Sequence, residues 1–334
     1  MSIAKSGIMA SLSRTRLIAL GSEDGGIALR RQNAYRHGIR QIILTSTKSY
    51  AKILFAQRAV SEVFNMVIDF HTHVFPDKIA DKTVALLRER SSSTAYSDGK
   101  VSGLISRMAE AGVDVSVALP VLTSPAQFES VARFAAELNE RFKHESRRII
   151  SFAGIHPDCE DIPGKMKYIK DSGFLGVKIH PDYQGTFIDD ERYVEIVRCA
   201  MELDLIVVTH SGVDGAYLDS PVRCTPERAL KLLRRAPHKK LVFAHLGASR
   251  MIDEVMELLA GEDVYFDTAY TLKYTAPEAL MALIKKHGAD RMLFATDSPW
   301  SSMESDLKII RALGLSSEDE EKILSGNARK LLGI

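Results

Sequence analysis

Histidine is the residue type whose placement in this sequence points most directly to chemistry. His71 and His73 stand one residue apart in "VIDFHTHVFP" (67–76), at the end of an apolar run. Successive side chains of a strand point to opposite faces, so both imidazoles would share one face while Thr72 takes the other. Such a pair is either a buried structural feature or half of a metal site, and the motif alone does not decide between them.

The other histidines favour the metal interpretation because of where they fall. Six of the ten histidines lie at the ends of apolar, β-branched segments: His71, His73, His156, His180, His210 and His245. Lys178 lies in the same segment as His180, and Asp267 and Asp297 end two further segments. Imidazoles and a carboxylate that converge in a concave site form a typical ligand set for a divalent metal, most often zinc. We therefore expect a catalytic metal site with one position open to water. Asp267 is also a candidate to orient a ligand histidine.

A regular alternation of strands and helices must position these residues. Strands are expected at 66–71, 113–120, 149–157, 174–181, 205–212, 241–248, 264–270 and 291–299. Continuous apolar runs of this length are typical of strands that are covered on both faces. Amphipathic helices separate them, with Ser124–Pro125 and Thr225–Pro226 as helix starts and Gly288 as a helix end.

This rhythm predicts an α/β fold, a (β/α)8 TIM barrel, in preference to an open doubly wound sheet. Eight strand and helix units in roughly 270 residues match the usual size of such a barrel. The active site of this fold lies at the carboxyl ends of the strands, which is where the histidines and aspartates fall.

Composition limits the classes of function. A chain of 334 residues with 46% hydrophobic and 26% charged residues is an ordinary globular protein, and its net charge of +1 gives no overall attraction to nucleic acid or membranes. No apolar run is long enough for a transmembrane helix. Three cysteines without C-x-x-C spacing indicate buried or idle thiols in a reducing compartment. We expect a cytoplasmic protein that acts on a small molecule, with no nucleic-acid or membrane partner and a homodimer as the default assembly.

Residues 1–65 differ in composition from the rest of the chain. They carry ten Lys and Arg against three Asp and Glu, and they lack a convincing alternation of strand and helix signals. Two explanations stay open: an organellar transit peptide, or a start codon assigned too far upstream with Met66 as the natural initiator. We favour the second. In either case we expect a poorly structured extension outside the fold, with the enzyme domain at 66–334.

Four motifs carry a resemblance to a known family. "DFHTH" (69–73), "VVTH" (207–210), "FAHLG" (243–247) and "ATDSPW" (295–300) resemble, in this order, the strand-end motifs of the amidohydrolase superfamily. The resemblance is closest to its amidohydrolase-2 branch, which includes aminocarboxymuconate-semialdehyde decarboxylase-like enzymes. The closing "GNARKLLGI" (326–334) is also similar to the end of that branch. The resemblance covers residues 66–334 and leaves 1–65 without a counterpart.

The resemblance implies a ligand set and leaves the number of metals open. His71, His73, His210 and Asp297 would hold a divalent metal, with zinc expected. His245 would lie beside the metal as a ligand of a second ion or as a proton-handling residue. Lys178 would be carboxylated and bridge two ions in two-metal members, whereas in the one-metal branch it need not bind metal.

The site residues also have roles that follow from their chemistry. Asp297 is expected to contact the metal and take a proton from its water, the alternative being a helix cap before "SPW". His245 would polarise the substrate or move a proton, unless it is a buried structural histidine. His180 either shapes a loop or contacts substrate. Arg223 and Arg250 are candidates to bind a substrate carboxylate.

Three functions fit these residues. The first expectation is a metal-dependent hydrolase, in which metal-activated water attacks an ester, lactone or amide of a small molecule. The alternative is a non-oxidative decarboxylase, a carboxy-lyase that protonates carbon before carbon dioxide leaves a small unsaturated or aromatic carboxylate. The third is a metal-binding protein without catalysis, which would have a closed ligand set.

Overall fold

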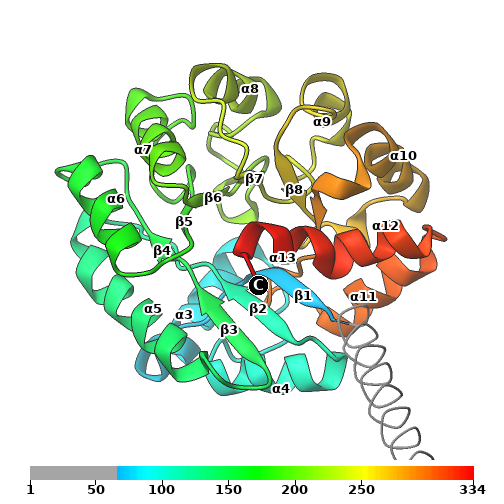
Figure 1. The fold of residues 1–334 in the computed structure, drawn as a ribbon, viewed down its shortest axis with the longest axis horizontal. Coiled ribbons are helices and arrows are strands. Elements are labelled where there is room, and N and C mark those ends of the chain that lie inside the picture. The colour runs from blue at the N-terminus through cyan, green and yellow to red at the C-terminus, as the bar shows by residue number, and fades with distance from the viewer. Residues whose placement is uncertain (1–65) are drawn as a thin grey trace, which may run out of the picture. The chain divides into compact units, whose positions relative to one another are not determined.

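Parallel strands form the centre of the molecule and helices form a ring around them (Figure 1). This computed structural model describes residues 66–334. The expectations for residues 1–65, including the poorly structured extension and the start at Met66, therefore lie outside the described residues. Within 66–334 the predicted α/β barrel is confirmed: strand and helix alternate along the chain, and all strand pairs are parallel.

The strands form two parallel ladders, β1-β2-β3 and β4-β5-β6-β7-β8-β9. Their bounds are β1 (Ile68–Thr72), β2 (Val115–Ala118), β3 (Arg148–Ser151), β4 (Ala153–Gly154), β5 (Gly176–Ile179), β6 (Ile206–Thr209), β7 (Leu241–Phe243), β8 (Tyr265–Asp267) and β9 (Met292–Leu293). Each predicted segment contains a strand, and Phe152 divides the third segment into β3 and β4. The barrel closes where the Phe70 amide donates to the Phe294 carbonyl (2.9 Å) and Thr72 pairs with Ser298.

Helices connect the strands and cover their outer side. Their bounds are α3 (Asp77–Ser91), α4 (Val101–Ala111), α5 (Phe128–Phe142), α6 (Ile162–Asp171), α7 (Glu191–Glu202), α8 (Pro226–Arg235), α9 (Ile252–Leu258), α10 (Pro277–His287), α11 (Met303–Ala312), α12 (Ser317–Glu321) and α13 (Asn327–Leu332). The predicted starts and stop are found: Ser124 caps a short turn before α5, Thr225 caps α8, and Gly288 follows α10 with a positive φ of 100°.

Two apolar layers pack against the strands, one on each side. The layer inside the barrel contains Ile68 and Phe70 of β1 with the matching residues of other strands, and Leu331 and Leu332 of α13 complete it. Because the strand residues in this layer include the first positions of several strands, α13 closes the amino-terminal end of the barrel (Figure 1). The carboxyl-terminal end of the barrel is not covered by α13, and it is the end at which this fold carries its active site.

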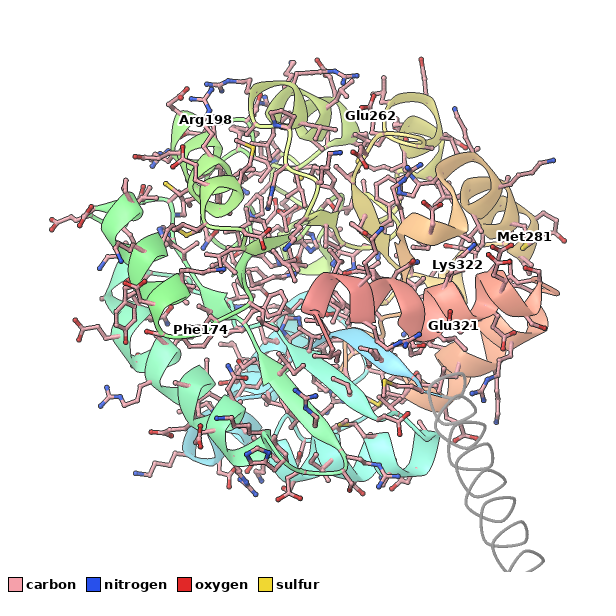
Figure 2. All side chains as sticks on the ribbon, in the orientation of Figure 1. Phe174, Arg198, Glu262, Met281, Glu321 and Lys322 are labelled. Carbon is pink, nitrogen blue, oxygen red and sulfur yellow. The ribbon has the colours of Figure 1, made fainter. Side chains whose placement is uncertain are left out.

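The second apolar layer separates the strands from the helices. Phe174, just before β5, is buried in it, whereas charged residues such as Arg198 on α7 extend from the outer ring (Figure 2). Within residues 66–334, no helix has both the length and the apolar character needed to cross a membrane.

Strand β1 contains an irregularity that matters for the site. Its register against β2 shifts between Asp69 and Thr72, so β1 has one residue more than its partner there. Phe70 belongs to the barrel interior, yet the next residue, His71, also contacts interior groups such as Lys178 of β5. Neighbouring residues of a regular strand face opposite sides, so the bulge is what turns His71 inward.

Candidate active site

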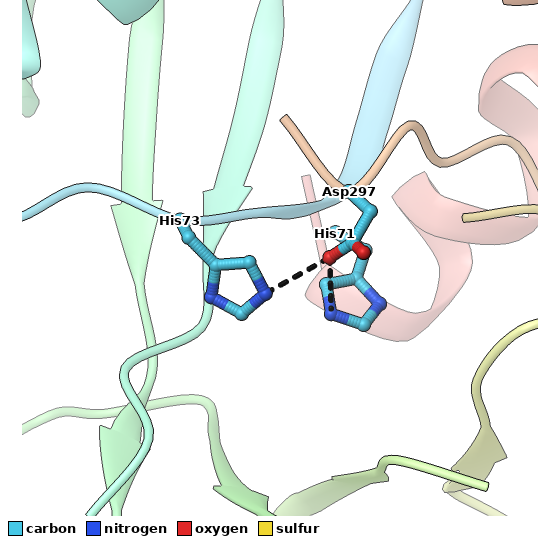
Figure 3. Close-up of side chains that lie close together, drawn as sticks. All are labelled: His71, His73 and Asp297. Atoms are coloured by element: carbon cyan, nitrogen blue, oxygen red, sulfur yellow. Dashed lines mark hydrogen bonds and ion pairs between the residues drawn. The ribbon is translucent and has the colours of Figure 1, made fainter. Parts of the chain in front are cut away.

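His71, His73 and Asp297 meet at the carboxyl-terminal end of the barrel (Figure 3). One ligand atom from each lies within 4.8 Å of the others. Asp297 Oδ1 is 3.0 Å from His73 Nε2 and 3.5 Å from His71 Nε2. The His71 side chain is buried, and the His73 and Asp297 side chains are slightly exposed, at 14% and 12%, so these two residues connect the group to solvent.

Hydrogen bonds on the far side of each ring determine which nitrogen carries a proton. His71 Nδ1 is 2.8 Å from a carboxylate oxygen of Asp267, and His73 Nδ1 is 2.8 Å from the carbonyl oxygen of Leu119. Both partners only accept, so both Nδ1 atoms donate and both Nε2 atoms carry bare lone pairs. The His73 lone pair faces the Asp297 carboxylate with no donor between them, and the His71 lone pair faces the same carboxylate and Lys178 Nζ (3.1 Å). Acceptors that face one another in this way are what a cation satisfies. The group therefore fits a divalent metal.

The backbone places the Asp297 carboxylate between the two imidazoles. Asp297 has a left-handed φ of 63°, its amide donates to the His71 carbonyl (2.8 Å), and its own carbonyl accepts from the Trp300 amide (2.8 Å). Asp297 does not cap the following helix, because the side chain of Ser302 caps α11. The carboxylate is thus directed toward the imidazoles by a tight turn tied to β1.

Lys178 of β5 approaches the same group from across the barrel. Its Nζ lies 3.1 Å from His71 Nε2, and its side chain is buried. Burial lowers the pKa of Lys178 to about 8, although Asp267 and Asp297 oppose that shift. Burial, with Lys178 as the second cause, also keeps the pKa of His71 well below its usual value, so this imidazole stays neutral and able to bind a metal.

His210 and His245 form a hydrogen-bonded pair beside this group. His245 Nδ1 is 3.0 Å from the carbonyl oxygen of Ala269, which leaves Nε2 bare, and that atom lies 2.9 Å from His210 Nδ1. The two rings are 4.7 Å apart, and the His245 ring is 5.4 Å from that of His71. The predicted ligand His210 is therefore next to the group but not within its 4.8 Å span.

A second group of possible ligand atoms comes from His180, His210 and Asp214. The rings of His180 and His210 stack 4.2 Å apart at 8°. The nitrogen lone pairs of stacked rings lie in parallel planes, so they cannot both point at one ion. His180 Nδ1 also accepts from the Tyr183 amide (3.4 Å), which leaves the proton on Nε2 facing Asp214 (3.4 Å). We interpret His180 and Asp214 as an imidazole–carboxylate pair and not as metal ligands.

The two predicted arginines lie in different surroundings. Arg223 is mostly buried and pairs with Asp182, with Nη1 3.5 Å from Oδ1. Burial raises the pKa of Asp182 to about 6, opposed by its hydrogen bonds with Arg223. Arg250 is exposed and has a left-handed φ of 61°. Asp182 Oδ2 lies 3.8 Å from His210 Nε2, so Asp182 holds Arg223 near His210, whereas Arg250 is exposed to solvent.

Sequence reasoning missed three carboxylates around the site: Asp69, Asp182 and Asp214. Asp214 follows His210 by four residues in a loop, and a search for acids just beyond the strand ends would have found it. Asp69 precedes His71 by two residues in "DFHTH". Only the bulge in β1 shows that the Asp69 side chain does not share the face of His71. Elsewhere, "KLLRRAPHKK" (231–240) is rich in basic residues, and two of them pair with acids: Arg234 contacts Glu262 (2.7 Å) and Lys240 contacts Asp204 (2.7 Å).

Comparisons with known proteins identify the family of this chain. The family described as amidohydrolase matches residues 68–334. The chain belongs to the amidohydrolase family. It is thus a metal-dependent enzyme of the amidohydrolase superfamily, as the sequence motifs predict. A search of curated protein sequences found no match.

Solved structures share the amidohydrolase fold at low sequence identity. 5-Carboxyvanillate decarboxylase from Sphingomonas paucimobilis is 16% identical, with a TM-score of 0.59 over 81% of this chain and 99% of that chain. A dihydroxybenzoic acid decarboxylase from a Polaromonas species, with bound manganese and the inhibitor 2-nitroresorcinol, is 18% identical, with a TM-score of 0.59 over 80% and 97%. An uncharacterized TIM-barrel protein from Bordetella bronchiseptica is 18% identical, with a TM-score of 0.65 over 80% and 98%.

Proposed function

We propose that this amidohydrolase is a non-oxidative decarboxylase of a small aromatic or unsaturated carboxylate. The observation that carries the proposal is the convergence of two bare imidazole nitrogens on the Asp297 carboxylate, beside a hydrogen-bonded pair of imidazoles. The first arrangement suits a divalent cation, and the second suits the transfer of a proton. Decarboxylation of a carboxylate through protonation at carbon can use both.

In this proposal His71, His73 and Asp297 hold the metal, and His210 is the next candidate ligand. A bound divalent metal would anchor and polarise the anionic substrate. Asp267 keeps His71 in the correct tautomer, because its carboxylate accepts the Nδ1 proton (2.8 Å). Manganese and zinc both suit imidazole and carboxylate ligands, and manganese is the ion bound in the Polaromonas decarboxylase.

His245 and Asp297 are the proposed proton-handling residues. His210 Nδ1 donates to His245 Nε2 across 2.9 Å, so a proton that reaches His210 Nε2 from solvent can pass through the pair to His245 without a large movement, and His210 stays neutral. A proton delivered to the carbon that bears the carboxylate allows the carbon–carbon bond to break. Its electron pair then restores the unsaturated system, and carbon dioxide leaves. The product keeps the delivered proton as a carbon–hydrogen bond.

Substrate binding is assigned to the polar residues around the mouth. Arg250 is exposed in the loop after β7 and can pair with a carboxylate, whereas the His180 Nε2 proton faces Asp214 (3.4 Å) and would have to leave that pair to contact a substrate. Arg223 is already paired with Asp182, so we assign it a supporting role. The first expectation from the sequence was hydrolysis. The decarboxylases among the similar structures support decarboxylation instead.

The test is to incubate the manganese-loaded protein with phenolic and unsaturated carboxylates and to measure release of carbon dioxide. Lactones, esters and amides are screened in parallel by acid release. We expect metal-dependent carbon dioxide release from at least one carboxylate. Hydrolysis of a lactone or ester, with no decarboxylation across the panel, would contradict the proposal.

Hydrolysis is kept as the second candidate because of Lys178. Its buried Nζ lies 3.1 Å from His71 Nε2, and its pKa of about 8 leaves part of the lysine unprotonated and able to react with carbon dioxide to form a carbamate. A carbamate there would add two oxygen ligands between the His71 group and the His210–His245 pair. Two metals per chain would favour this alternative, and one would favour the decarboxylase.

A further inference from the structure

The inward direction of His71 has a structural cost within β1. The bulge between Asp69 and Thr72 lets Phe70 and His71 both reach the barrel interior. A bulge interrupts the ladder, so its amide groups lose their regular partners and need others. Without another acceptor, the buried His71 amide would be left unpaired, and a regular strand would be favoured in which His71 faces away from the site.

The Asp69 carboxylate supplies that acceptor. Its Oδ1 accepts from the His71 amide (3.3 Å) and from the Thr296 amide (3.0 Å), and its Oδ2 lies 2.5 Å from the Thr296 hydroxyl. The Asp69 side chain is fully buried. One side chain therefore joins the bulge of β1 to the residue that precedes Asp297.

Thr296 is also hydrogen-bonded to the turn that contains Asp297. The Thr296 hydroxyl accepts from the Ser298 amide (3.1 Å), so side chains bind the turn on both sides of the left-handed Asp297. The same turn is tied to β1 by the Asp297 amide on the His71 carbonyl (2.8 Å) and by the His73 amide on the Ser298 carbonyl (2.6 Å). Asp69 and Thr296 thus connect β1 and its two candidate ligands, His71 and His73, to the turn that contains Asp297.

We propose that Asp69 is a positioning residue of the metal site, which acts through Thr296 to hold the β1 bulge and the Asp297 turn in register. Asp69 does not touch the candidate metal position, and it sets where the ligand atoms of His71 and Asp297 lie. The inference rests on the proposed function, because it assumes that His71, His73 and Asp297 bind a divalent metal. Residues that orient ligands typically change metal affinity by about 10–100-fold when they are removed.

The test compares Mn²⁺ affinity in the full chain, measured by titration calorimetry, with thermal stability measured on the metal-free protein. Asp69→Ala should weaken Mn²⁺ binding by about 10-fold or more. Asp69→Asn keeps one oxygen for both amides and should stay within about threefold of wild type. Thr296→Val should also weaken Mn²⁺ binding. The double variant Asp69→Ala, Thr296→Val should lose clearly less binding free energy than the sum of the two single losses, because both substitutions break the same Asp69–Thr296 contact.

The matched control is Asp114→Ala. The Asp114 carboxylate accepts from the Val67 amide (2.9 Å), so it also holds β1, but just before the strand begins, far from His71. This change should lower the melting temperature and leave Mn²⁺ affinity unchanged. Equal loss of affinity in the Asp69 and Asp114 variants would reduce Asp69 to a structural role and overturn the inference.

Two further outcomes keep the inference separate from the proposed function. If Asp69→Ala does not fold, an unchanged Mn²⁺ affinity in Thr296→Val overturns the inference. If the wild type binds no metal, the proposed function fails, and crystal structures of wild type and Asp69→Ala still test the positioning. Loss of the His71 Nδ1–Asp267 contact in the variant supports it, and an unchanged His71 ring contradicts it.

Discussion

At the scale of single residues, the site depends on which ring nitrogen is free. Asp267 and the Leu119 carbonyl take the Nδ1 protons of His71 and His73, so both rings present Nε2 to Asp297. The histidines and Asp297 were predictable as candidate ligands because imidazoles and carboxylates at strand ends are easy to recognise in a sequence. Asp267 was also predicted as a residue that orients a ligand histidine, and it is the partner of His71 Nδ1. The partner of His73 Nδ1 was not predictable, because it is the backbone carbonyl of Leu119 and no residue type marks it.

Lys178 allows the one-metal and two-metal forms to be distinguished by a single substitution. In the one-metal form its ammonium donates to His71 Nε2 and competes with the metal for that nitrogen. Lys178→Met should then leave Mn²⁺ affinity unchanged or raise it, with one ion per chain before and after. In the two-metal form the same variant should lose one ion. Mass spectrometry of the metal content and titration calorimetry on both proteins measure the difference.

At the scale of elements, the sequence predicted the strand segments and the helix caps but not the irregular features that aim the ligands. Apolar runs, Thr225–Pro226 and Gly288 carry local signals, and the structure confirms them. The bulge in β1 depends on how β1 pairs with β2, and it places Phe70 and His71 on one side against strict alternation. The third segment likewise divides at Phe152 because β3 pairs with β2 and β4 pairs with β5, which no local sequence signal shows.

The contact between α10 and β8 should make stability depend on pH. His287 of α10 is buried, stacks on Phe266 (ring centroids 3.9 Å apart), and accepts from the Gly261 amide. Burial, with Arg291 as the second cause, lowers the pKa of His287 to about 4. The unfolded chain binds this proton below about pH 6.5, so the stabilising contribution is present above pH 6.5 and is lost as the pH falls toward 4.

His287→Gln tests this dependence, because glutamine keeps an acceptor and does not titrate. The free energy of unfolding from urea denaturation should fall less between pH 7 and pH 4.5 in the variant than in the wild type, with a difference of at most about 3 kcal/mol. Equal decreases in the two proteins would show that His287 does not contribute to the acid sensitivity of the fold.

At the scale of the whole molecule, the barrel separates stability from chemistry. α13 fills the amino-terminal end with apolar side chains, and the candidate ligands gather at the carboxyl-terminal end. The family match begins at residue 68, and we propose that the enzyme domain comprises residues 66–334, with 1–65 outside it. The substrate could not be predicted from the sequence, because residues such as Arg250 and His180 come from loops whose spatial relation depends on the closed barrel.

The most direct test of the central claim is the divalent metal content of the purified protein, compared between wild type and a His71→Ala, His73→Ala double variant. We predict at least one equivalent of bound divalent metal per wild-type chain after expression with added manganese and zinc. The double variant should fold and retain none at this site, because Asp297 alone cannot hold the ion. A wild-type protein without metal, or a double variant that keeps the full amount, would contradict the account.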